Sequence, residues 1–100
     1  MFDEFDWDET KRTTNFEKHE IDFEDAIEIF KRSVVVVPER EGGGGEVRYV
    51  AIGLLDDVEI AVIYTRRSNV CRVISARRAR KNERRAHREA FPEEYAQGQD

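Results

Sequence analysis

Several features that define common protein classes are scarce in this 100-residue chain. Cys71 is the only cysteine, so no disulfide can form within the chain. Its place in an apolar segment is typical of a buried small side chain rather than a nucleophile. No apolar run approaches the ~18 residues that a membrane-spanning helix needs, and the acidic N-terminus lacks the apolar core of a signal peptide. We therefore expect a cytoplasmic protein with no membrane segment.

Charge, by contrast, is abundant and unevenly distributed. Charged residues make up 39% of the sequence, and the formal net charge is −5. Residues 1–65 carry 7 basic and 17 acidic side chains, whereas residues 66–88 carry 10 basic side chains and 1 acidic one. A block of one sign within a chain of the other sign can focus an electrostatic field. Segment 66–88 is therefore where we expect a polyanion to bind, locally and with a strong dependence on salt.

The N-terminal third has the pattern of one short strand followed by two helices. Phe5 and Trp7 would share one face of an edge strand, because alternate residues of a strand point the same way. Asp8 is placed to cap a polar surface helix from about residue 9 to residue 19. Asp22 should cap a second helix, whose apolar stripe at i, i+3, i+4 and i+7 consists of Phe23, Ala26, Ile27 and Phe30.

The middle of the chain alternates apolar runs with turn signals. A valine-rich strand at 33–37 is stopped by Pro38, and the glycine quartet at its centre makes 39–46 a flexible loop. Three further apolar segments are joined by short turns, which indicates antiparallel hairpins. These segments are residues 47–55, 58–65 and 70–75.

The C-terminal part should form a basic helix. Ser75 is expected to cap this helix, which would run to about Ala90 and leave residues 91–100 as a frayed tail. The chain is thus expected to be a single α+β domain. In it, an antiparallel sheet of about four strands is covered by two N-terminal helices and followed by the basic C-terminal helix.

Three motifs, taken in order, resemble those of one protein family. The quoted residues are Phe5-x-Trp7-Asp8 with Lys18-His19 and Asp22-Phe23-x-x-Ala26, then Arg48-Tyr49-Val50-Ala51-Ile52-Gly53, then Arg72-Val73-Ile74-Ser75-Ala76-Arg77-Arg78-Ala79. Together they resemble BrnT-type toxins over about residues 5–88. The resemblance implies a RelE-like fold and a ribonuclease toxin of a type II toxin–antitoxin pair. It also implies a BrnA-like antitoxin as partner, with operator DNA bound through that antitoxin.

The chain departs from the family pattern at one position that affects local structure. After Lys18-His19 the family usually has glycine, whereas this chain has Glu20. Glycine adopts the left-handed conformation that often ends a helix at little cost. The end of the first helix is therefore where the structure is expected to differ.

Cleavage of RNA by its own 2′-hydroxyl needs a base, an acid and cations around the pentacovalent phosphate. Arginine suits the last task, because its planar guanidinium pairs with two phosphate oxygens and stays charged. Arg48 and Arg72 interrupt apolar strands, where an unpaired charge is costly, and Arg77 begins the basic segment. We expect these three, with His19 as acid or base, to be the catalytic residues.

Four other residues are candidates for substrate binding. Lys18, Arg78 and Arg80 could contact the RNA backbone, although each also suits a solvated surface or a contact with an acidic antitoxin. Tyr49 could stack on an unpaired base, and it equally suits packing against the sheet.

These observations lead to one main hypothesis and two alternatives. The main hypothesis is a metal-independent endoribonuclease that cleaves RNA and inhibits translation until its antitoxin neutralises it. The alternatives are a non-catalytic module of a toxin–antitoxin repressor complex and an inactivated relative. His87 and Glu46 remain alternative acid–base groups. Two histidines without cysteine pairs do not suit a metal site, so we expect neither metal nor cofactor.

Overall fold

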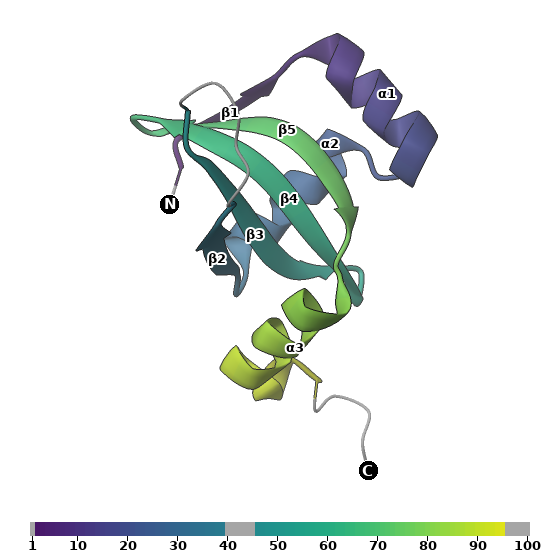
Figure 1. Cartoon of the computed structure of the whole chain (residues 1–100), viewed down its shortest axis with the longest axis vertical. Helices are drawn as coiled ribbons and strands as arrows, with labels where there is room; N and C mark the ends of the chain where they lie inside the picture. The colour runs from purple at the N-terminus through teal and green to yellow at the C-terminus, as the bar shows by residue number, and fades with distance from the viewer. Residues whose placement is uncertain (1, 40–45, 96–100) are drawn as a thin grey trace.

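One five-stranded sheet organises the molecule, with the strands in the spatial order β1-β5-β4-β3-β2 (Figure 1). The structure is a computed structural model that describes residues 2–39 and 46–95. The predicted glycine loop therefore lies largely outside the described residues. The strand bounds are β1 (Glu4–Trp7), β2 (Val35–Pro38), β3 (Arg48–Leu55), β4 (Val58–Arg67) and β5 (Val70–Arg78).

The predicted hairpins are confirmed, because β3, β4 and β5 pair in antiparallel fashion through short turns. Asp56 and Asp57 form the first turn with φ values of 49° and 65°. Positive φ at both positions matches the twist of a two-residue hairpin. The expected sheet of about four antiparallel strands is only partly right. The short strand predicted at Phe5 and Trp7 is present and joins the sheet as a fifth strand, β1, which runs parallel to β5 with Phe5 opposite Cys71.

Two N-terminal helical segments follow β1. The polar helix α1 (Glu9–His19) is capped by Asp8, whose side chain accepts from the backbone N–H groups of Thr10 and Lys11. Glu20 ends it with φ 59°, so the left-handed conformation is kept although the residue is not glycine. The second segment begins at Asp22, as expected, with α2 (Phe23–Ala26), and then continues as the 3-10 helix η1 (Ile27–Lys31).

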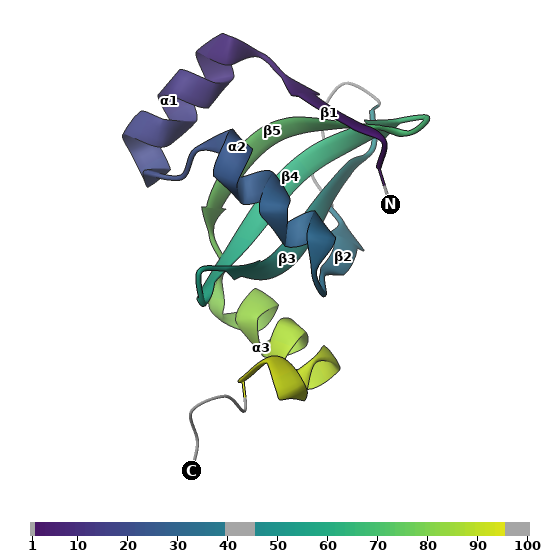
Figure 2. The same ribbon diagram turned by 180° about the vertical axis from the view of Figure 1, so that it is seen from behind.

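The 3-10 continuation changes which residues face the sheet. Phe23, Ala26 and Ile29 are fully buried, whereas Ile27 and Phe30 are only half-buried. A 3-10 helix has three residues per turn, so a spacing of three aligns the buried side chains. The predicted stripe at i, i+3, i+4 and i+7 is therefore only partly right. This segment packs on Ala51, Val62, Val73 and their neighbours, and we call the covered side the helix face (Figure 2).

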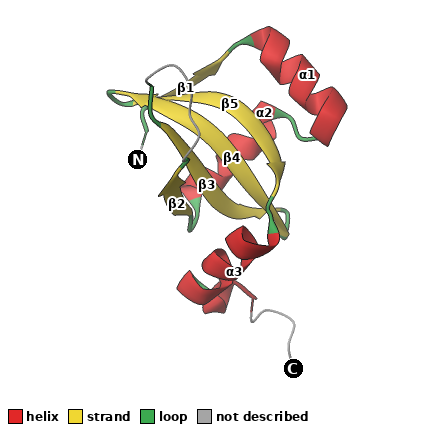
Figure 3. Cartoon of the chain, viewed as in Figure 1, coloured by secondary structure: helices red, strands yellow, loops and turns green. Residues whose placement is uncertain are grey.

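The C-terminal helix begins later than expected. Ser75 lies inside β5 rather than capping a helix, because strand pairing with β4 continues to Arg78. Helix α3 (Lys81–Ala90) lies beyond the end of β5 (Figure 3). Its first turn is capped by the Glu83 carboxylate, which accepts from the backbone N–H of Arg80 at 2.7 Å. Among the described residues, no helix is long and apolar enough to cross a bilayer.

The predicted frayed tail is ordered over its first residues. Residues Pro92–Tyr95 form the 3-10 helix η2, and only the tail beyond them lies outside the description. The Tyr95 hydroxyl is 2.6 Å from Nδ1 of His87 and donates to Glu59 at 2.9 Å. Burial and the hydrogen bond to Glu59 raise the pKa of Tyr95 well above its ordinary value. A short polar segment is thus held against α3 and β4.

Candidate functional site

The side of the sheet opposite α2 carries a row of polar residues across three neighbouring strands. Arg48 lies opposite Thr65 on the next strand, and Thr65 lies opposite Arg72 on the strand after that. Since neighbouring strands are about 4.8 Å apart, the backbones at the two arginines are separated by about 10 Å. Arg77 lies further along β5 on the same side, opposite Ala61. We call the side that carries Arg48, Arg72 and Arg77 the arginine face; Figure 1 views the sheet from this side.

Within residues 2–39 and 46–95, Arg48 and Arg72 each form one ion pair, and neither pair is bidentate. The Arg48 guanidinium lies 3.8 Å from Glu39, and that of Arg72 lies 3.3 Å from Asp6. The two arginine side chains are 36% and 38% exposed. Exposed pairs of this kind are worth about 0–1 kcal/mol, so an RNA phosphate can compete with the carboxylates at little cost.

Arg77 is bound much more firmly. Its Nη1 and Nη2 donate to the two carboxylate oxygens of Glu83 at 2.8 and 2.9 Å. The side chains of this pair are only 16% and 12% exposed. The bidentate bond raises the pKa of Arg77 and lowers that of Glu83. Arg77 therefore ties the end of β5 to the start of α3, and a phosphate would have to displace Glu83 from both nitrogens.

A shallow groove lies along the β5 edge of the arginine face. Lys18 and His19 line it from α1, and Ile74 and Ser75 line it from β5. The strand register shifts here, since Ser75 lies opposite Ile63 while Val73 lies opposite Tyr64. Ile74 is thus the extra residue of a β-bulge, a feature that commonly redirects side chains beside functional sites. Sequence analysis missed both the bulge and this role of Ser75.

A buried asparagine fixes α1 beside this groove. The Asn15 amide nitrogen donates to the carbonyl oxygens of Ala76 and Ile21, and its oxygen accepts from the Ala76 N–H, all within 3.1 Å. Asn15 is 7% exposed, whereas Phe16, the only apolar side chain of α1, is 51% exposed. Helix α1 is therefore held to β5 by hydrogen bonds rather than by an apolar stripe. A single asparagine in a polar helix gave no sequence signal of this role.

The remaining predicted binding residues are not brought together with the arginine row. Tyr49 lies on the helix face, where its ring stacks on Tyr64 at a centroid distance of 5.6 Å. Arg78 is exposed, and it lines a different groove on the helix face. Arg80 is exposed at the start of α3.

The other acid–base candidates have structural contacts instead. His87 is fully buried, with Nε2 2.9 Å from the Ser33 carbonyl oxygen and Nδ1 bound to Tyr95. Glu46 accepts a hydrogen bond from Arg67 at 3.1 Å. Cys71 is buried, and this burial raises the pKa of its thiol to about 12, as expected for a packed rather than reactive cysteine.

Comparison with known proteins identifies the family. The family model described as "Ribonuclease toxin, BrnT, of type II toxin-antitoxin system" matches residues 7–83. No curated protein matches the chain significantly. Within residues 2–39 and 46–95, no three His, Cys, Asp or Glu side chains form a cluster that could hold a metal ion. The family match runs from the last residue of β1 to the first turn of α3 and includes the whole arginine row. The chain therefore belongs to the BrnT family of ribonuclease toxins of type II toxin–antitoxin systems.

Proposed function

We propose that this chain is a metal-independent endoribonuclease whose RNA lies across the arginine face. The observation that carries the proposal is the row formed by Arg48, Thr65 and Arg72. The row presents two cations about 10 Å apart at their backbones. Arginine side chains are long enough for both guanidinium groups to converge on one phosphate or on adjacent phosphates. Their weak ion pairs leave them ready to exchange a carboxylate for a phosphate.

The reaction that suits this arrangement is transesterification. The 2′-oxygen of the RNA forms a bond to the neighbouring phosphorus, and the bond to the 5′-oxygen of the next nucleotide breaks. Negative charge builds up on the phosphate oxygens between these events. Arg48 and Arg72 would stabilise that charge most strongly in the transition state, which lowers the barrier. Arg77 would contribute to the same field through its position on the arginine face, while keeping α3 in place through Glu83.

The groove beside α1 supplies the candidates for proton transfer. His19 is half-buried at the end of α1, next to Lys18 and across from Ser75. An imidazole can remove the 2′-hydroxyl proton or protonate the 5′-oxygen near neutral pH. Lys18 would hold a flanking phosphate. Arg80 would contact RNA that extends from the arginine face toward α3. Arg78 would contact RNA that passes the end of β5.

The family implies an antitoxin partner and an RNA substrate. We propose that a BrnA-like antitoxin neutralises this chain, that free toxin inhibits translation by cutting RNA, and that the complex binds operator DNA through the antitoxin. The toxin is expected to act as a cytoplasmic protein.

The test is an RNA cleavage assay with the purified full-length chain, with and without EDTA and with and without the antitoxin encoded beside it. We expect cleavage that EDTA leaves unchanged and that one equivalent of antitoxin abolishes. The Arg48→Ala/Arg72→Ala double variant, purified identically, controls for contaminating ribonuclease. Cleavage that stops in EDTA would contradict the metal-independent mechanism. Tight antitoxin binding without any cleavage would favour the non-catalytic alternative.

A further inference from the structure

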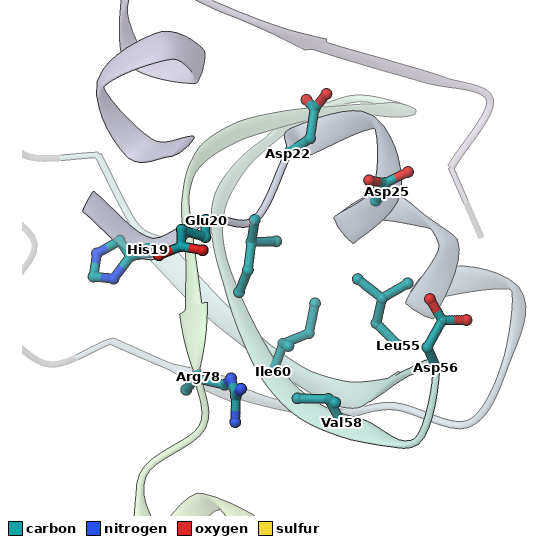
Figure 4. A pocket seen from close by; sticks show the side chains of 10 residues that line it. His19, Glu20, Asp22, Asp25, Leu55, Asp56, Val58, Ile60 and Arg78 are labelled. Atoms are coloured by element: carbon teal, nitrogen blue, oxygen red, sulfur yellow. The ribbon is translucent and has the colours of Figure 1, made fainter. Parts of the chain in front are cut away.

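A second groove, on the helix face, is separate from the arginine row. It has a volume of about 470 Å³ and lies between the α1–α2 connection and the β3–β4 hairpin. Its lining comes from distant parts of the chain, including Glu20, Asp25, Leu55, Val58 and Arg78. Figure 4 shows their side chains arranged around a common opening.

The floor of this groove is apolar. Ile21 and Ile60 are buried beneath it, and Leu55 and Val58 are half-buried at its surface. These side chains belong to or pack against the main core cluster, so the floor is held rigidly by the sheet. A rigid, partly exposed apolar floor between charged edges suits one apolar anchor residue of a partner better than it suits a flexible polar chain.

The rim of the groove is predominantly acidic. Glu20, Asp25 and Asp56 are all exposed, and none of them forms an ion pair within the described part of the chain. Asp22 also lines the groove, but Arg12 binds both of its oxygens at 2.7 and 3.1 Å and lowers its pKa. Three uncompensated carboxylates therefore surround the floor, opposed mainly by Arg78 at one end.

This charge distribution favours one kind of ligand over another. Nucleic acid would place phosphates against the three carboxylates, which repel them. A peptide with lysine or arginine on either side of an apolar residue would place cations at the rim and its anchor on the floor. Such a ligand would occupy the helix face and leave Arg48 and Arg72 uncovered.

We propose that this groove is a docking site for a basic amphipathic peptide segment of another protein. One apolar side chain of the segment rests on Leu55 and Val58, and its flanking lysine or arginine side chains face Glu20, Asp25 and Asp56. Docking of this peptide depends on the groove and its charges and not on ribonuclease activity. The groove floor lies on the opposite side of the sheet from Arg48 and Arg72, and only His19 and Arg78 at its edge are also proposed to contact RNA.

The test uses amide NMR shifts of the full-length chain titrated with a synthetic twelve-residue peptide of leucine and lysine. The comparison peptide has glutamate in place of every lysine. We expect the lysine peptide to shift the amides that line the groove. The Asp25→Lys/Asp56→Lys variant should weaken binding about tenfold, because two attractive contacts become repulsive. The matched control is Glu93→Lys, which reverses an equally exposed acid on η2 and should change binding less than twofold.

The apolar floor is tested separately from the charges. Leu55→Gln should weaken binding of the lysine peptide about fivefold. If this variant unfolds, Val58→Thr, which conserves shape, provides the same test with an effect of about threefold. No binding of the lysine peptide, equal binding of the glutamate peptide, or shifts confined to the arginine face or α3 would overturn the proposal. Amide shifts of Asp25, Leu55 and Val58 caused by a short RNA would do the same. All these variants leave Arg48, Arg72 and His19 intact, so loss of docking is distinguishable from loss of RNA cleavage.

Discussion

At the scale of single residues, Asn15 shows how one buried amide sets the geometry of a site. Its side chain bonds to the backbone N–H and to the carbonyl oxygen of Ala76, the residue before Arg77 on β5. Asn15 is only 7% exposed, so solvent has little access to these bonds. The position of Lys18 and His19 beside β5 therefore depends on the hydrogen bonds of one buried residue.

We predict that Asn15→Ala will lower the free energy of unfolding by about 2 kcal/mol or more, because it leaves buried backbone groups of Ala76 without partners. Urea unfolding followed by circular dichroism measures this loss. Thr14→Ala is the control, since Thr14 is exposed on the same helix and should cost less than about 0.5 kcal/mol. Equal stability of the two variants would show that α1 is not held by these bonds.

The Arg77–Glu83 pair makes a prediction about pH. The pKa of Glu83 is lowered from its ordinary value of 4.5, chiefly by the hydrogen bonds from Arg77. Because the pKa of Glu83 is lower in the folded state, the stabilisation of the fold by this pair is fully present above about pH 4.5. It is lost as the pH falls through the pKa of Glu83 in the folded state. Glu83→Gln should therefore cost about 2 kcal/mol at pH 7 and progressively less as the pH falls below 4.5.

Unfolding in urea from pH 7 downward, as far as both proteins remain folded, gives this difference directly. Glu93→Gln, which changes an exposed carboxylate, should show no such trend. A cost for Glu83→Gln that stays constant with pH would mean that the charge of Glu83 does not stabilise the fold.

Residue types predicted part of the site and missed the rest for physical reasons. Strand alternation correctly indicated that Arg48 and Arg72 would leave the core, because their neighbours in sequence are apolar. It could not reveal that Thr65 aligns them, since register depends on pairing between strands. Nor could it reveal the bidentate bond of Arg77, because the start of α3 was placed at Ser75 instead of beyond Arg78.

At the scale of elements, the close approach of η1 to β3 depends on one glycine. A Cβ atom at Gly53 would lie 2.9 Å from Cβ of Ile29 and 3.2 Å from Cγ1 of Val34. Contacts to a Cβ atom cannot be relieved by a rotamer change, so the 3-10 helix would have to move. Gly53 thus allows the second helical segment to lie directly on the sheet.

We predict that Gly53→Ala will destabilise the protein by about 1–3 kcal/mol, as expected for an added methyl group in a filled core. Thermal unfolding measures the effect. Ala61→Gly is a useful comparison, because it removes a methyl group from the neighbouring strand on the opposite side of the sheet. It should destabilise the protein by leaving space in the core rather than by overfilling it. Stability of Gly53→Ala at or above that of the wild type would mean that η1 is not packed this closely.

Local elements were predictable, and elements that depend on distant contacts were not. Asp8, Asp22 and the Asp56-Asp57 turn were identified correctly, because caps and tight turns are determined by a few adjacent residues. The parallel pairing of β1 with β5 joins residues more than sixty positions apart, such as Phe5 and Cys71, and no local pattern encodes it. The 3-10 form of η1, which packs against β3, was likewise not indicated by the apolar spacing of its own sequence.

At the scale of the whole molecule, this acidic chain has two surfaces of opposite charge. The arginine face gathers cations from β3 and β5, while the groove between the α1–α2 connection and the β3–β4 hairpin gathers carboxylates. The groove floor and the row of Arg48, Thr65 and Arg72 lie on opposite sides of one sheet, so a ligand on the floor leaves Arg48 and Arg72 uncovered. The net charge of −5 therefore describes neither surface.

In the proposed mechanism, Arg48 and Arg72 bind the scissile phosphate together. The most direct test is kcat/KM for RNA cleavage by Arg48→Ala and Arg72→Ala, with Arg66→Ala as control. Arg66 is the residue after Thr65 on β4, points to the helix face, and lies 5.4 Å from the Phe2 ring centroid. We expect a loss of about 100-fold for each of the first two variants and less than about threefold for the control. Equal activity of all three variants and the wild type would contradict this mechanism.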